Sequence, residues 1–544
     1  MKIAAAQINP RVGDIKFNLA LILKQIDLAK SKGVQLIVFP ELAILGYPPR
    51  DLLSYSHLID ENLEALQKIK QHSQGISVVV GYVERNPSPL GKPYFNSAAV
   101  LQNGNLIKNY RKKLLPSYDV FEEERYFQPG EHGAVFEIQN KKIGLTICED
   151  VWNEPGFIER EYDLKPLEDF KDVDLDLLVN LSASPFQLGK KEIRDQLFQL
   201  VSKKIGCPVV FCNQVGANDE LIFDGGSFVV APHGKCVVAQ DFQSELLIWD
   251  EGTQQPSVLL PLRTESQTLI EALSLGIRDY VEKSGARTVC LGLSGGIDSS
   301  VVAALAVKAL GPNRVYGFTL PSRFNASQSL EDAEKLAANL GISCRNLAIE
   351  PIFQVFERVV TQAIGNNPKT LTLENIQPRI RMTLLMALAN EAGHLLLNTS
   401  NKSEIFAGYA TLYGDTAGAI SVLGDLTKHQ VYLLAQEFNC PKEVIPQRVI
   451  SRAPSAELRE NQTDQDSLPP YDILDSLVKN HMEKTQSLQR LSSPQISQET
   501  IEKISKLNAF SEYKRRQLPP ALRVTSKAFG MGRRMPVVGR KSSE

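Results

Sequence analysis

The 544-residue sequence has no excess of positive charge, because 60 Lys and Arg residues stand against 62 Asp and Glu residues. A chain with this balance has no broad basic surface to neutralise phosphates, which excludes nucleic acid as a principal partner. No apolar run reaches the length needed to cross a bilayer, and the first residues lack the apolar core of a signal peptide. We therefore expect a cytoplasmic protein without membrane contact that acts on small molecules.

Cysteine is sparse: the seven residues are scattered, odd in number and form no CxxC pair. This pattern argues against a disulfide framework and a zinc site, and it favours a reducing compartment. The remaining composition, 43% hydrophobic and 22% charged, is that of a globular protein. Because 544 residues exceed one ordinary hydrophobic core, two large domains are expected.

The first half of the chain alternates short apolar, β-rich runs with amphipathic helical spacing, as over Asn18–Lys32. Such alternation predicts an α/β domain whose strands are mostly buried. The predicted strands are Lys2–Ile8, Val34–Phe39, Ser77–Tyr82, Ser97–Leu101, Ile143–Ile147, Leu177–Asn180, Val209–Asn213 and Ser227–Ala231.

A polar, turn-rich stretch at Glu251–Pro256 interrupts this pattern and marks a domain boundary. We place the first domain at residues 1–255, a linker at 256–268 and a second α/β domain at 269–544. The elements predicted after the boundary are a helix at Gln267–Ser284, a strand at Thr288–Leu293, a helix at Ser299–Leu310, and strands at Val315–Leu320 and Leu395–Thr399.

Three polar residues in the first half follow β-rich runs: Glu41, Lys112 and Cys148. Open α/β sheets carry their sites at strand ends, so each is a candidate active-site position. Together they suit amide hydrolysis through a thioester. Cys148 would attack the amide carbon, Glu41 would take the thiol proton and later activate water, and Lys112 would stabilise the oxyanion. A cationic Lys112 would also favour the Cys148 thiolate.

Taken singly, each of these residues has a more ordinary interpretation. A cysteine at the end of an apolar strand is more often an inert core residue. Glu41 or Lys112 alone would be interpreted as surface charge. It is the order Glu, Lys, Cys, together with the flanking residues, that favours the catalytic interpretation.

This order resembles the nitrilase, or carbon-nitrogen hydrolase, superfamily. The stretches Lys112–Phe127, Cys148–Trp152 and Ser182–Phe186 resemble its glutamine-using branch. The resemblance implies an α-β-β-α sandwich and a glutamine-binding site formed by Tyr118, Glu123, Ser184 and Lys190, with Glu123 supporting the other residues. At the position of Lys190, other members carry Arg.

A second motif lies at Leu291–Ser300, between a predicted strand and a predicted helix. Its glycines let the backbone aim N–H groups at an anion, and the helix N-terminus adds a positive dipole. Ser294, Ser299 and Ser300 can donate hydrogen bonds to the same phosphates, and Asp298 can hold Mg²⁺. A Gly-rich turn of purely structural use is the ordinary alternative.

The chain lacks the GxxxxGK[ST] loop of kinases and GTPases. The motif resembles instead the pyrophosphate loop of ATP pyrophosphatases, which adenylate a substrate while ATP is cleaved to AMP and pyrophosphate. The resemblance implies a doubly wound parallel sheet. It also implies ATP contacts at Gly292, Leu293, Ser294, Gly295, Gly296, Ile297, Asp298, Ser299 and Ser300. The loop alone leaves the substrate open, because synthetases for GMP, asparagine, argininosuccinate and NAD all resemble it.

Further motifs choose among these substrates. The stretches Glu374–Met382, Asn398–Glu404, Gly408–Asp415, Gly424–Lys428, Lys514–Gln517 and Phe529–Pro536 resemble NAD synthetases. Fusion to a nitrilase-type domain resembles their glutamine-dependent form. Such enzymes adenylate the nicotinate carboxylate of deamido-NAD and let ammonia displace AMP. The implied contacts are Thr399 with ATP; Asn375, Glu404, Tyr409 and Lys514 with deamido-NAD; and Asp298 with Glu404 for Mg²⁺.

Two further residues and one helix boundary are expectations from the sequence itself. Asp415 would orient the incoming ammonia and Lys428 would steady the phosphates, with a turn acid and a surface lysine as the ordinary alternatives. A helix is expected to start within the stretch Glu374–Met382, and Gln377–Arg379 are expected to lie just before its first turn.

Another ATP-pyrophosphatase amidotransferase, acting on a different carboxylate or carbonyl substrate, is the second interpretation. GMP synthetase relatives use a Cys-His-Glu glutaminase and asparagine synthetase relatives an N-terminal Cys. Here position 2 is Lys2, and none of the seven His residues has a setting that suggests a Cys partner. A binding or regulatory protein with a decayed site is the third, and an inert Cys148 thiol would favour it. The family resemblance also implies a homo-oligomer.

Overall fold

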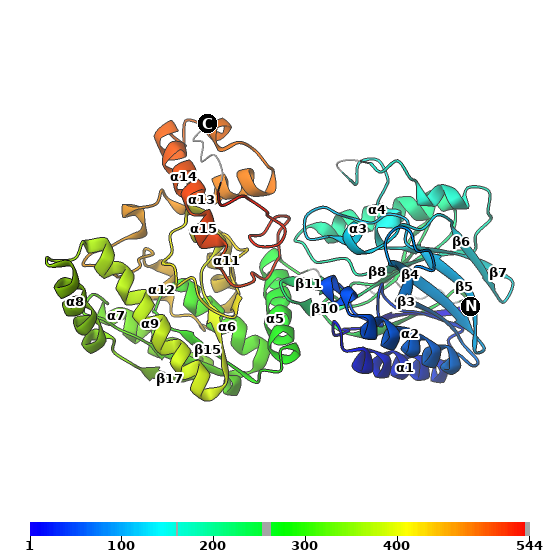
Figure 1. Ribbon diagram of the computed structural model, residues 1–544, viewed down its shortest axis with the longest axis horizontal. Helices are drawn as coiled ribbons and strands as arrows, with labels where there is room; N and C mark the ends of the chain where they lie inside the picture. Colours follow the sequence, from blue (N-terminus) through cyan, green and yellow to red (C-terminus); the bar gives the residue numbers. More distant parts are fainter. Residues whose placement is uncertain (159–160, 253–262, 539–544) are drawn as a thin grey trace. The chain divides into compact units, whose positions relative to one another are not determined.

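The structure, a computed structural model, describes residues 1–158, 161–252 and 263–538. The chain divides into two compact units, Met1–Leu262 and Arg263–Glu544 (Figure 1). Residues 256–262 of the predicted linker lie outside the described residues, whereas residues 265–268 belong to helix α5 (Glu265–Lys283). No helix in the described ranges is long and apolar enough to span a membrane.

Two six-stranded sheets form the centre of the first unit. The first has the order β14-β1-β2-β3-β4-β5 and the second β13-β12-β9-β8-β7-β6, and β10 and β11 form a separate hairpin. The first sheet contains β1 (Lys2–Gln7), β2 (Leu36–Val38), β3 (Ser77–Arg85), β4 (Tyr94–Gln102), β5 (Asn105–Arg111) and β14 (Glu245–Asp250). The second contains β6 (Ala134–Ile138), β7 (Lys141–Ile147), β8 (Leu177–Ser182), β9 (Val209–Asn213), β12 (Phe228–Ala231) and β13 (Gly234–Val238). The hairpin strands are β10 (Val215–Asn218) and β11 (Leu221–Asp224).

The first unit is a four-layer sandwich, with helices outside both sheets (Figure 1). Because side chains alternate along a strand, Ile3 of β1 joins the apolar cluster between the sheets while its neighbour Ala4 faces outward. The outward face of the first sheet packs against α1 (Ile15–Ser31) and α2 (Ser56–His72). The second sheet packs against α4 (Lys190–Ile205). This confirms the predicted α-β-β-α sandwich.

All eight strands predicted for this unit are present, and their ends shift by at most three residues. Six described strands were not predicted: β5, β6, β10, β11, β13 and β14. Strand β5 shows why, since it lies at the sheet edge and exposes Asn105, Leu106 and Ile107. Such a strand lacks the buried apolar face by which strands are recognised in a sequence.

The second unit is built on a five-stranded parallel sheet of order β17-β16-β15-β18-β19. Its strands are β15 (Thr288–Gly292), β16 (Val315–Thr319), β17 (Ser343–Asn346), β18 (His394–Asn398) and β19 (Ile420–Ser421). The helices are α5, α6 (Ile297–Leu310), α7 (Ser327–Leu340), α8 (Glu350–Ile364), α9 (Thr370–Ala392), α10 (Lys402–Ala407), α11 (Lys428–Phe438), α12 (Gln447–Ser451), α13 (Tyr471–Val478), α14 (Gln498–Phe510) and α15 (Glu512–Arg515).

Helices cover this sheet as in a doubly wound fold (Figure 1). On one face, Cys290 of β15 and Leu396 of β18 share an apolar cluster with α8 and α9. The neighbours Val289 and Leu291 point to the opposite face and are also fully buried. Helix α6, which packs with α5 and α11, follows β15 directly. The loop between β15 and α6 therefore lies at the carboxyl edge of the sheet, where such folds place their ligands.

The expected helix start at Glu374–Met382 is wrong. Helix α9 begins at Thr370, so Pro378 lies inside the helix and not before it. The first turns of α9 expose Leu371 and Thr372, and this irregular mixture hides the helix in the sequence.

Candidate functional site

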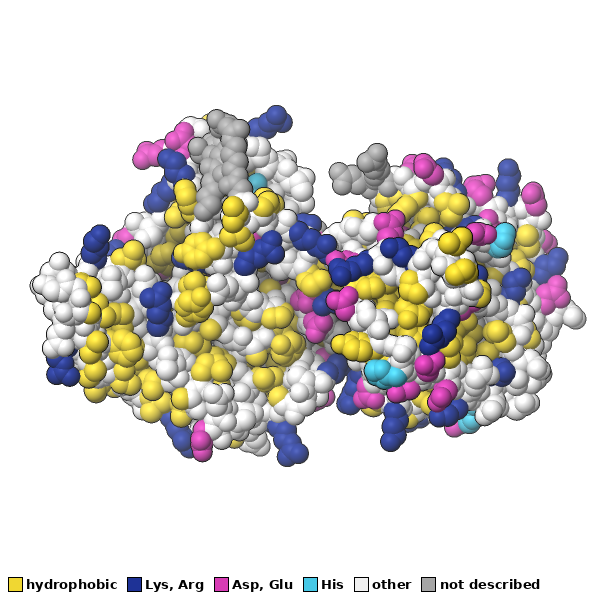
Figure 2. All heavy atoms as spheres, in the orientation of Figure 1, with side chains coloured by type: hydrophobic (Ala, Val, Ile, Leu, Met, Phe, Trp, Pro, Cys, Tyr) yellow, Lys and Arg dark blue, Asp and Glu magenta, His cyan; other side chains and the backbone are white. Residues whose placement is uncertain are grey.

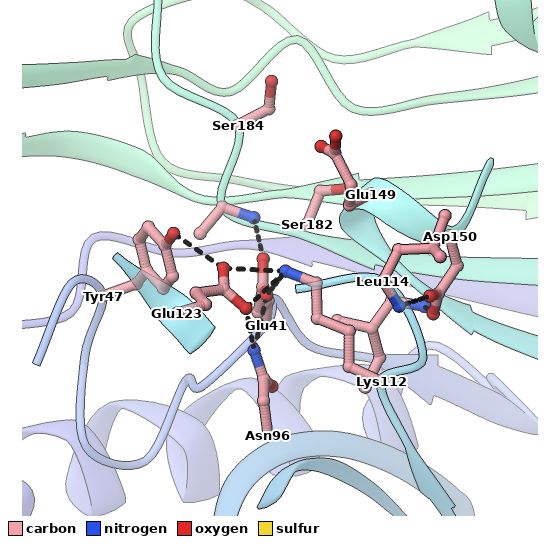
Figure 3. Close-up of polar contacts among 12 residues, drawn as sticks. Glu41, Tyr47, Asn96, Lys112, Leu114, Glu123, Glu149, Asp150, Ser182 and Ser184 are labelled. Atoms are coloured by element: carbon pink, nitrogen blue, oxygen red, sulfur yellow. Dashed lines mark hydrogen bonds and ion pairs between the residues drawn. The ribbon is translucent and has the colours of Figure 1, made fainter. Parts of the chain in front are cut away.

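The first site begins at Cys148, the residue that directly follows strand β7. Its φ is 44°, a left-handed conformation that an ordinary residue adopts at a cost. The carboxylate of Asp150 fixes this turn, because it accepts hydrogen bonds from the backbone N–H of Ile147 and of Leu114, both at 2.9 Å (Figure 3). Since Leu114 lies two residues after Lys112, Asp150 also ties the cysteine turn to the lysine segment.

Glu41 is fully buried just after strand β2. One carboxylate oxygen accepts from Asn96 Nδ2 and from Lys112 Nζ, both at 2.7 Å, and the other accepts from Ala183 N at 3.1 Å. Figure 3 shows these donors converging on Glu41 from separate segments. The carboxylate is therefore held in one orientation before any substrate arrives.

Lys112 links Glu41 to a second buried carboxylate. Its Nζ lies 2.7 Å from Glu41 and 2.8 Å from Glu123, which also accepts from Tyr47 Oη at 2.9 Å. Burial alone would lower the pKa of Lys112, but the charges of Glu123 and Glu41 raise it well above the usual range. Burial raises the pKa of Glu123 to about 7, against the opposing effect of Lys112. Lys112 is therefore a permanent cation in this site.

The Cys148 thiol is neutral at rest. Burial and the charge of Glu41 raise its pKa well above the ordinary value, and the charge of Lys112 only partly opposes this. Lys112 favours the thiolate as expected, but desolvation of the thiol outweighs the effect of this one cation. The thiol must lose its proton during attack, and Glu41 is the negative charge with the largest effect on the pKa of that thiol.

A polar group borders Cys148. Glu149, the residue after Cys148, is buried, and its Oε1 accepts hydrogen bonds from Tyr118 Oη at 2.9 Å and Tyr162 Oη at 3.0 Å. Ser184 lies two residues after the end of strand β8. Its backbone N–H donates to Asn213 Oδ1 at 2.9 Å.

Lys190, the fourth predicted glutamine contact, is the first residue of α4. Its Nζ donates to the Pro185 carbonyl at 3.2 Å and lies 5.4 Å from the centre of the Trp152 ring. Pro185 directly follows Ser184, so Lys190 bonds to the same loop.

Sequence reasoning missed several residues that build this site. Asn96 and Asp150 carry no local signal beyond being polar, and their roles depend on strands far apart in the chain. Glu149 could have been found, since an acidic residue directly after a candidate nucleophile is unusual at the buried end of a strand. Gly81 was also missed: a Cβ there would lie 2.6 Å from the Pro40 carbonyl, so glycine lets the Glu41 segment lie against β3.

The second site is built on the loop between β15 and α6. Gly295 has a φ of 76°, and a Cβ at this position would lie 2.1 Å from the Ser329 carbonyl oxygen. Glycine is therefore required, both for the conformation and for the close approach of the two backbones. Gly296 caps α6, and the Ser294 and Ser299 hydroxyls lie 3.1 Å apart beside it. This arrangement offers hydroxyls and the free N–H groups of a helix start to an anion.

Two adjoining cavities open onto this loop. The first, of about 190 Å³, is largely apolar, with Leu293, Leu320 and Leu385 among its walls. The second, of about 250 Å³, is polar and is lined by Asp298 and Glu404, among others. The residues that line both are Ser294, Ser299, Asn325, Pro378, Arg381, Thr399, Asp415 and Ala456. An apolar compartment joined to a polar one suits a nucleoside and its phosphates.

Lys428 lies between the two carboxylates predicted to bind metal. Its Nζ is 2.6 Å from Asp298 and 3.1 Å from Glu404, and Asn401 Nδ2 donates to Asp298 at 3.0 Å. Burial raises the pKa of Glu404 to about 8, although Lys428 opposes the shift. Lys428, predicted to steady phosphates, is therefore paired with acids in this structure.

The same two carboxylates fit Mg²⁺ in number and kind, since they already share one cation, and Mg²⁺ typically takes one or two carboxylates plus substrate phosphates. Within the described part of the chain, no group of three or more His, Cys, Asp or Glu residues is arranged to hold a metal. The carboxylates would thus hold the ion together with phosphate oxygens.

Of the remaining predicted residues, three line the second cavity, whereas Asn375 and Lys514 line neither cavity. The three are Thr399, Tyr409 and Asp415. Asp415 accepts from Thr411 N at 2.6 Å, and burial raises its pKa to about 6. Asn375 on α9 accepts from Thr411 Oγ1 at 2.9 Å.

Lys514 joins this group from the C-terminal part of the chain. Its Nζ donates to the Gly408 and Ala410 carbonyls at 2.9 and 2.7 Å. Asn375 and Lys514 thus bond to residues within Gly408–Asp415, which also supplies Tyr409 and Asp415 to the cavity. Residues from distant parts of the unit meet on this one segment.

Comparison with known proteins matches each unit to a family. Residues 2–250 match the carbon-nitrogen hydrolase family and residues 269–519 the NAD synthase family. The glutamine-dependent NAD(+) synthetase of Synechocystis sp. is 42% identical over 98% of this chain and 98% of its own length. That of Thermotoga maritima is 36% identical, covering 99% of each chain.

A solved structure covers the whole chain as well. Glutamine-dependent NAD+ synthetase from Acinetobacter baumannii, in complex with ADP, has a TM-score of 0.78 and 36% identity. The alignment covers 100% of this chain and 99% of that one. Identity above 30% over whole chains establishes descent as well as fold. The chain belongs to the glutamine-dependent NAD+ synthetase family.

Proposed function

We propose that this chain releases ammonia from glutamine in its first unit and uses it, with ATP, to amidate deamido-NAD+ in its second unit. The observation that carries the proposal is that one chain contains both the buried set of Glu41, Lys112 and Cys148 and the loop between β15 and α6, whose turn requires glycine at Gly295. The relatives described above, named glutamine-dependent NAD(+) synthetases, support the same pairing of sites.

The first half-reaction follows from the charges around Cys148. As its sulfur forms a bond to the amide carbon of glutamine, the thiol proton passes to Glu41 and the electron pair of the C=O bond moves onto oxygen. Lys112, a permanent cation, stabilises that oxygen. Collapse expels ammonia, which takes the proton back from Glu41. A water molecule, activated by Glu41, then cleaves the thioester to glutamate and regenerates the thiol.

Glutamine carries a free α-ammonium and a free α-carboxylate. Glu149 and Lys190 offer a charge of opposite sign to each of them. Glu149 presents a buried carboxylate whose Oε1 is fixed by Tyr118 and Tyr162, so it suits the α-ammonium. Lys190 is a cation held beside Ser184 by the Pro185 carbonyl, so it suits the α-carboxylate. A site that binds both charged groups would discriminate against an amide that lacks them.

The second half-reaction takes place at the two adjoining cavities. A carboxylate oxygen of deamido-NAD+ attacks the α-phosphorus of ATP, and the bond to the β-phosphate oxygen breaks, so pyrophosphate leaves with the electron pair. Ammonia then attacks the acyl carbon, and AMP leaves as the C–N bond forms. Asp415, ionised above pH about 6, accepts a hydrogen bond from the ammonia and receives its surplus proton.

Mg²⁺ belongs to this proposal as a partner of the phosphates. Asp298 and Glu404 would hold it, and when bound it would neutralise charge on the departing pyrophosphate. Lys428, which bridges the two acids, keeps their carboxylates turned toward one point. Thr399 and the Ser294 and Ser299 hydroxyls line the space available to the phosphates.

The test is an assay of the purified chain with deamido-NAD+, ATP, Mg²⁺ and either glutamine or ammonium. We expect NAD+ and AMP in equal amounts from both nitrogen sources, with one glutamate per NAD+ or more when glutamine is supplied. Absence of NAD+ from both sources would contradict the proposal. Pyrophosphate release with other carboxylates would then identify a different ATP-pyrophosphatase amidotransferase.

A homo-oligomer and a cytoplasmic location complete the proposal. Helix α8 carries many apolar residues yet fully buries only Phe353. Val355, Phe356 and Val359 are each about half exposed, and Figure 2 shows hydrophobic side chains over α8 and α9. Monomers rarely leave such a continuous apolar face open, so we expect a second copy of this chain to cover it. Light scattering of the wild type and of Val359→Glu tests this, with dissociation expected in the variant.

The seven free cysteines suit a reducing compartment.

A further inference from the structure

One arginine of the second site carries a charge for which the described residues supply no ion-pair partner. Arg381 lies on α9 and lines both cavities, yet no described carboxylate lies within 4.0 Å of its guanidinium. A partly buried charge without a partner is costly and is seldom kept without a reason. Its position at the junction of the apolar and the polar cavity indicates what that reason is.

The guanidinium is held in place by neutral acceptors alone. Its Nε donates to the Leu320 carbonyl at 2.9 Å, and its Nη2 donates to Asn325 Oδ1 at 3.0 Å and, more weakly, to Ser322 Oγ at 3.5 Å. Among the described residues, Nη1 has no acceptor. An arginine has five N–H donors, so part of this fork remains available to a ligand. The bonds to Leu320 and Asn325 fix the plane of the fork, which makes it a preorganised anion receptor.

The nearest acids act on Arg381 only at longer range. Burial lowers the pKa of Arg381 to about 10, and the charges of Glu457 and Asp415 oppose this shift without forming an ion pair. Even so, the side chain stays cationic at neutral pH. By contrast, Lys428 in the same region is neutralised by Asp298 and Glu404. Arg452, which also lines the polar cavity, is paired with Glu457. Among the described cations that line the two cavities, Arg381 is thus the one without an ion pair and available to substrate.

The two cavities define which anion reaches it. If the apolar cavity takes the adenosine of ATP and the polar cavity its terminal phosphates, the α-phosphate must lie at the junction. Arg381, Thr399 and Ser299 line that junction, since each borders both cavities. The α-phosphorus is also the atom that the carboxylate of deamido-NAD+ attacks, and its equatorial oxygens carry the developing charge.

Building on the proposed function, we propose that Arg381 binds the α-phosphate of ATP and stabilises its non-bridging oxygens during adenylation. In that step the new bond between carboxylate oxygen and α-phosphorus forms as the bond to the pyrophosphate oxygen breaks. The electron pair leaves with pyrophosphate, and no proton is transferred. Arg381 is then a catalytic residue of the second site, because it touches the reacting phosphoryl group.

The test uses pyrophosphate exchange into ATP in the presence of deamido-NAD+, which reports adenylation without ammonia. We expect Arg381→Gln to lower the exchange rate about 10²-fold, as for loss of one oxyanion donor. Arg381→Lys should recover part of the rate, because it restores the charge without the fork. The control is Arg345→Gln, an exposed arginine on edge strand β17 that lines neither cavity, and it should exchange like the wild type.

A sulfur substitution locates the contact. The two diastereomers of ATPαS replace one non-bridging α-oxygen each, and sulfur accepts hydrogen bonds poorly. In the wild type, one diastereomer should react more slowly than ATP, and this ratio should shrink about 10-fold in Arg381→Gln. The corresponding ratio for ATPβS should be the same in both proteins. Thermal unfolding shows whether the Gln variant is folded, and the Lys variant decides the question if it is not.

Three results would overturn this assignment. Exchange by Arg381→Gln within about 3-fold of the wild type would remove Arg381 from the chemistry. A slow variant with an unchanged ATPαS ratio and a raised KM for deamido-NAD+ would place Arg381 on the other substrate. Absence of exchange in the wild type would overturn the proposed function itself, and Arg381 with it.

Discussion

The two sites differ in how far their charges are balanced before any substrate binds. In the first unit, Lys112 lies within 2.8 Å of Glu41 and Glu123, and every group is buried. In the second unit, Arg381 lines open cavities without an ion-pair partner among the described residues, and several segments far apart in the sequence contribute to the walls. The fold alone therefore balances the charges of Lys112, Glu41 and Glu123 in the first site. In the second site, the charge of Arg381 is balanced only when a substrate binds.

Substrate chemistry accounts for this difference. Glutamine carries one charge of each sign, so its binding site must contain fixed charges of its own. The free-energy cost of burying those charges arises during folding and not when glutamine binds. ATP and deamido-NAD+ bring several phosphates, so their site can keep a cation unpaired until they bind. The predictions below either break this contrast or sharpen it, and they run from the largest expected effect to the smallest.

Cys148→Ala should abolish synthesis from glutamine, with a loss of at least about 10⁴-fold, because no other group can form the thioester. Synthesis from ammonium should be unchanged, since the second site does not use the thiol. Rates of NAD+ formation from each nitrogen source measure this. Cys236→Ala, a partly buried thiol elsewhere in the same unit, is the control and should keep both activities. Loss of the ammonium route in Cys148→Ala would contradict the separation of the two sites.

Gly295→Ala should lower NAD+ synthesis about 10²-fold with either nitrogen source. A Cβ at Gly295 would lie 2.1 Å from the Ser329 carbonyl, so the loop must move away from its phosphate-binding position. Gly285→Ala is a matched control, because its φ of 80° is equally strained but nothing lies within 4 Å of the new Cβ. If both variants behave alike, backbone strain and not the close approach sets the effect.

Glu123→Gln should flatten the pH dependence of stability in the first unit. Burial raises the pKa of Glu123 to about 7, above its unfolded value near 4.3. The folded chain therefore binds this proton more tightly. Its contribution to stability is full below pH of about 4.3 and is lost as pH rises through 7, by a few kcal/mol at most.

Denaturation followed by tryptophan fluorescence at pH 5 and pH 8 measures this slope, because both Trp residues, Trp152 and Trp249, lie in the first unit. Glu124→Gln, the exposed neighbour, is the control. A slope in Glu123→Gln equal to that of the wild type would show that this carboxyl does not titrate in the range.

Tyr162→Phe should have the smallest effect. It removes one of the two hydroxyls that hold Glu149, which corresponds to about 3- to 10-fold in KM for glutamine with little change in kcat. Tyr126→Phe, whose hydroxyl bonds to the exposed Asp51, should leave KM unchanged. A fall in kcat with constant KM would move Glu149 from substrate binding to the chemical steps.

The architecture could be predicted from the sequence, and so could those site residues whose type and position after a strand are recognisable locally. Glu41, Lys112 and Cys148 each follow a β run, and the glycines after β15 mark a phosphate loop. Strand β5 escaped because its side chains face solvent at a sheet edge.

Residues whose roles arise from tertiary contacts escaped as well. Asn96 holds Glu41 across strands, and Arg381 is notable for the partners it lacks, which no local pattern encodes. The neutral state of Cys148 also needed the structure, since the outcome depends on how much burial opposes Lys112.

The most direct test of the central claim is a parallel assay of the two variants that each disable one site. Glutamine hydrolysis is measured with glutamine alone, and NAD+ formation with ammonium. We predict that Gly295→Ala retains the hydrolysis rate of the wild type and that Cys148→Ala retains its ammonium-driven synthesis. If either variant loses both activities, the two sites are not independently complete, and the contrast between them does not hold.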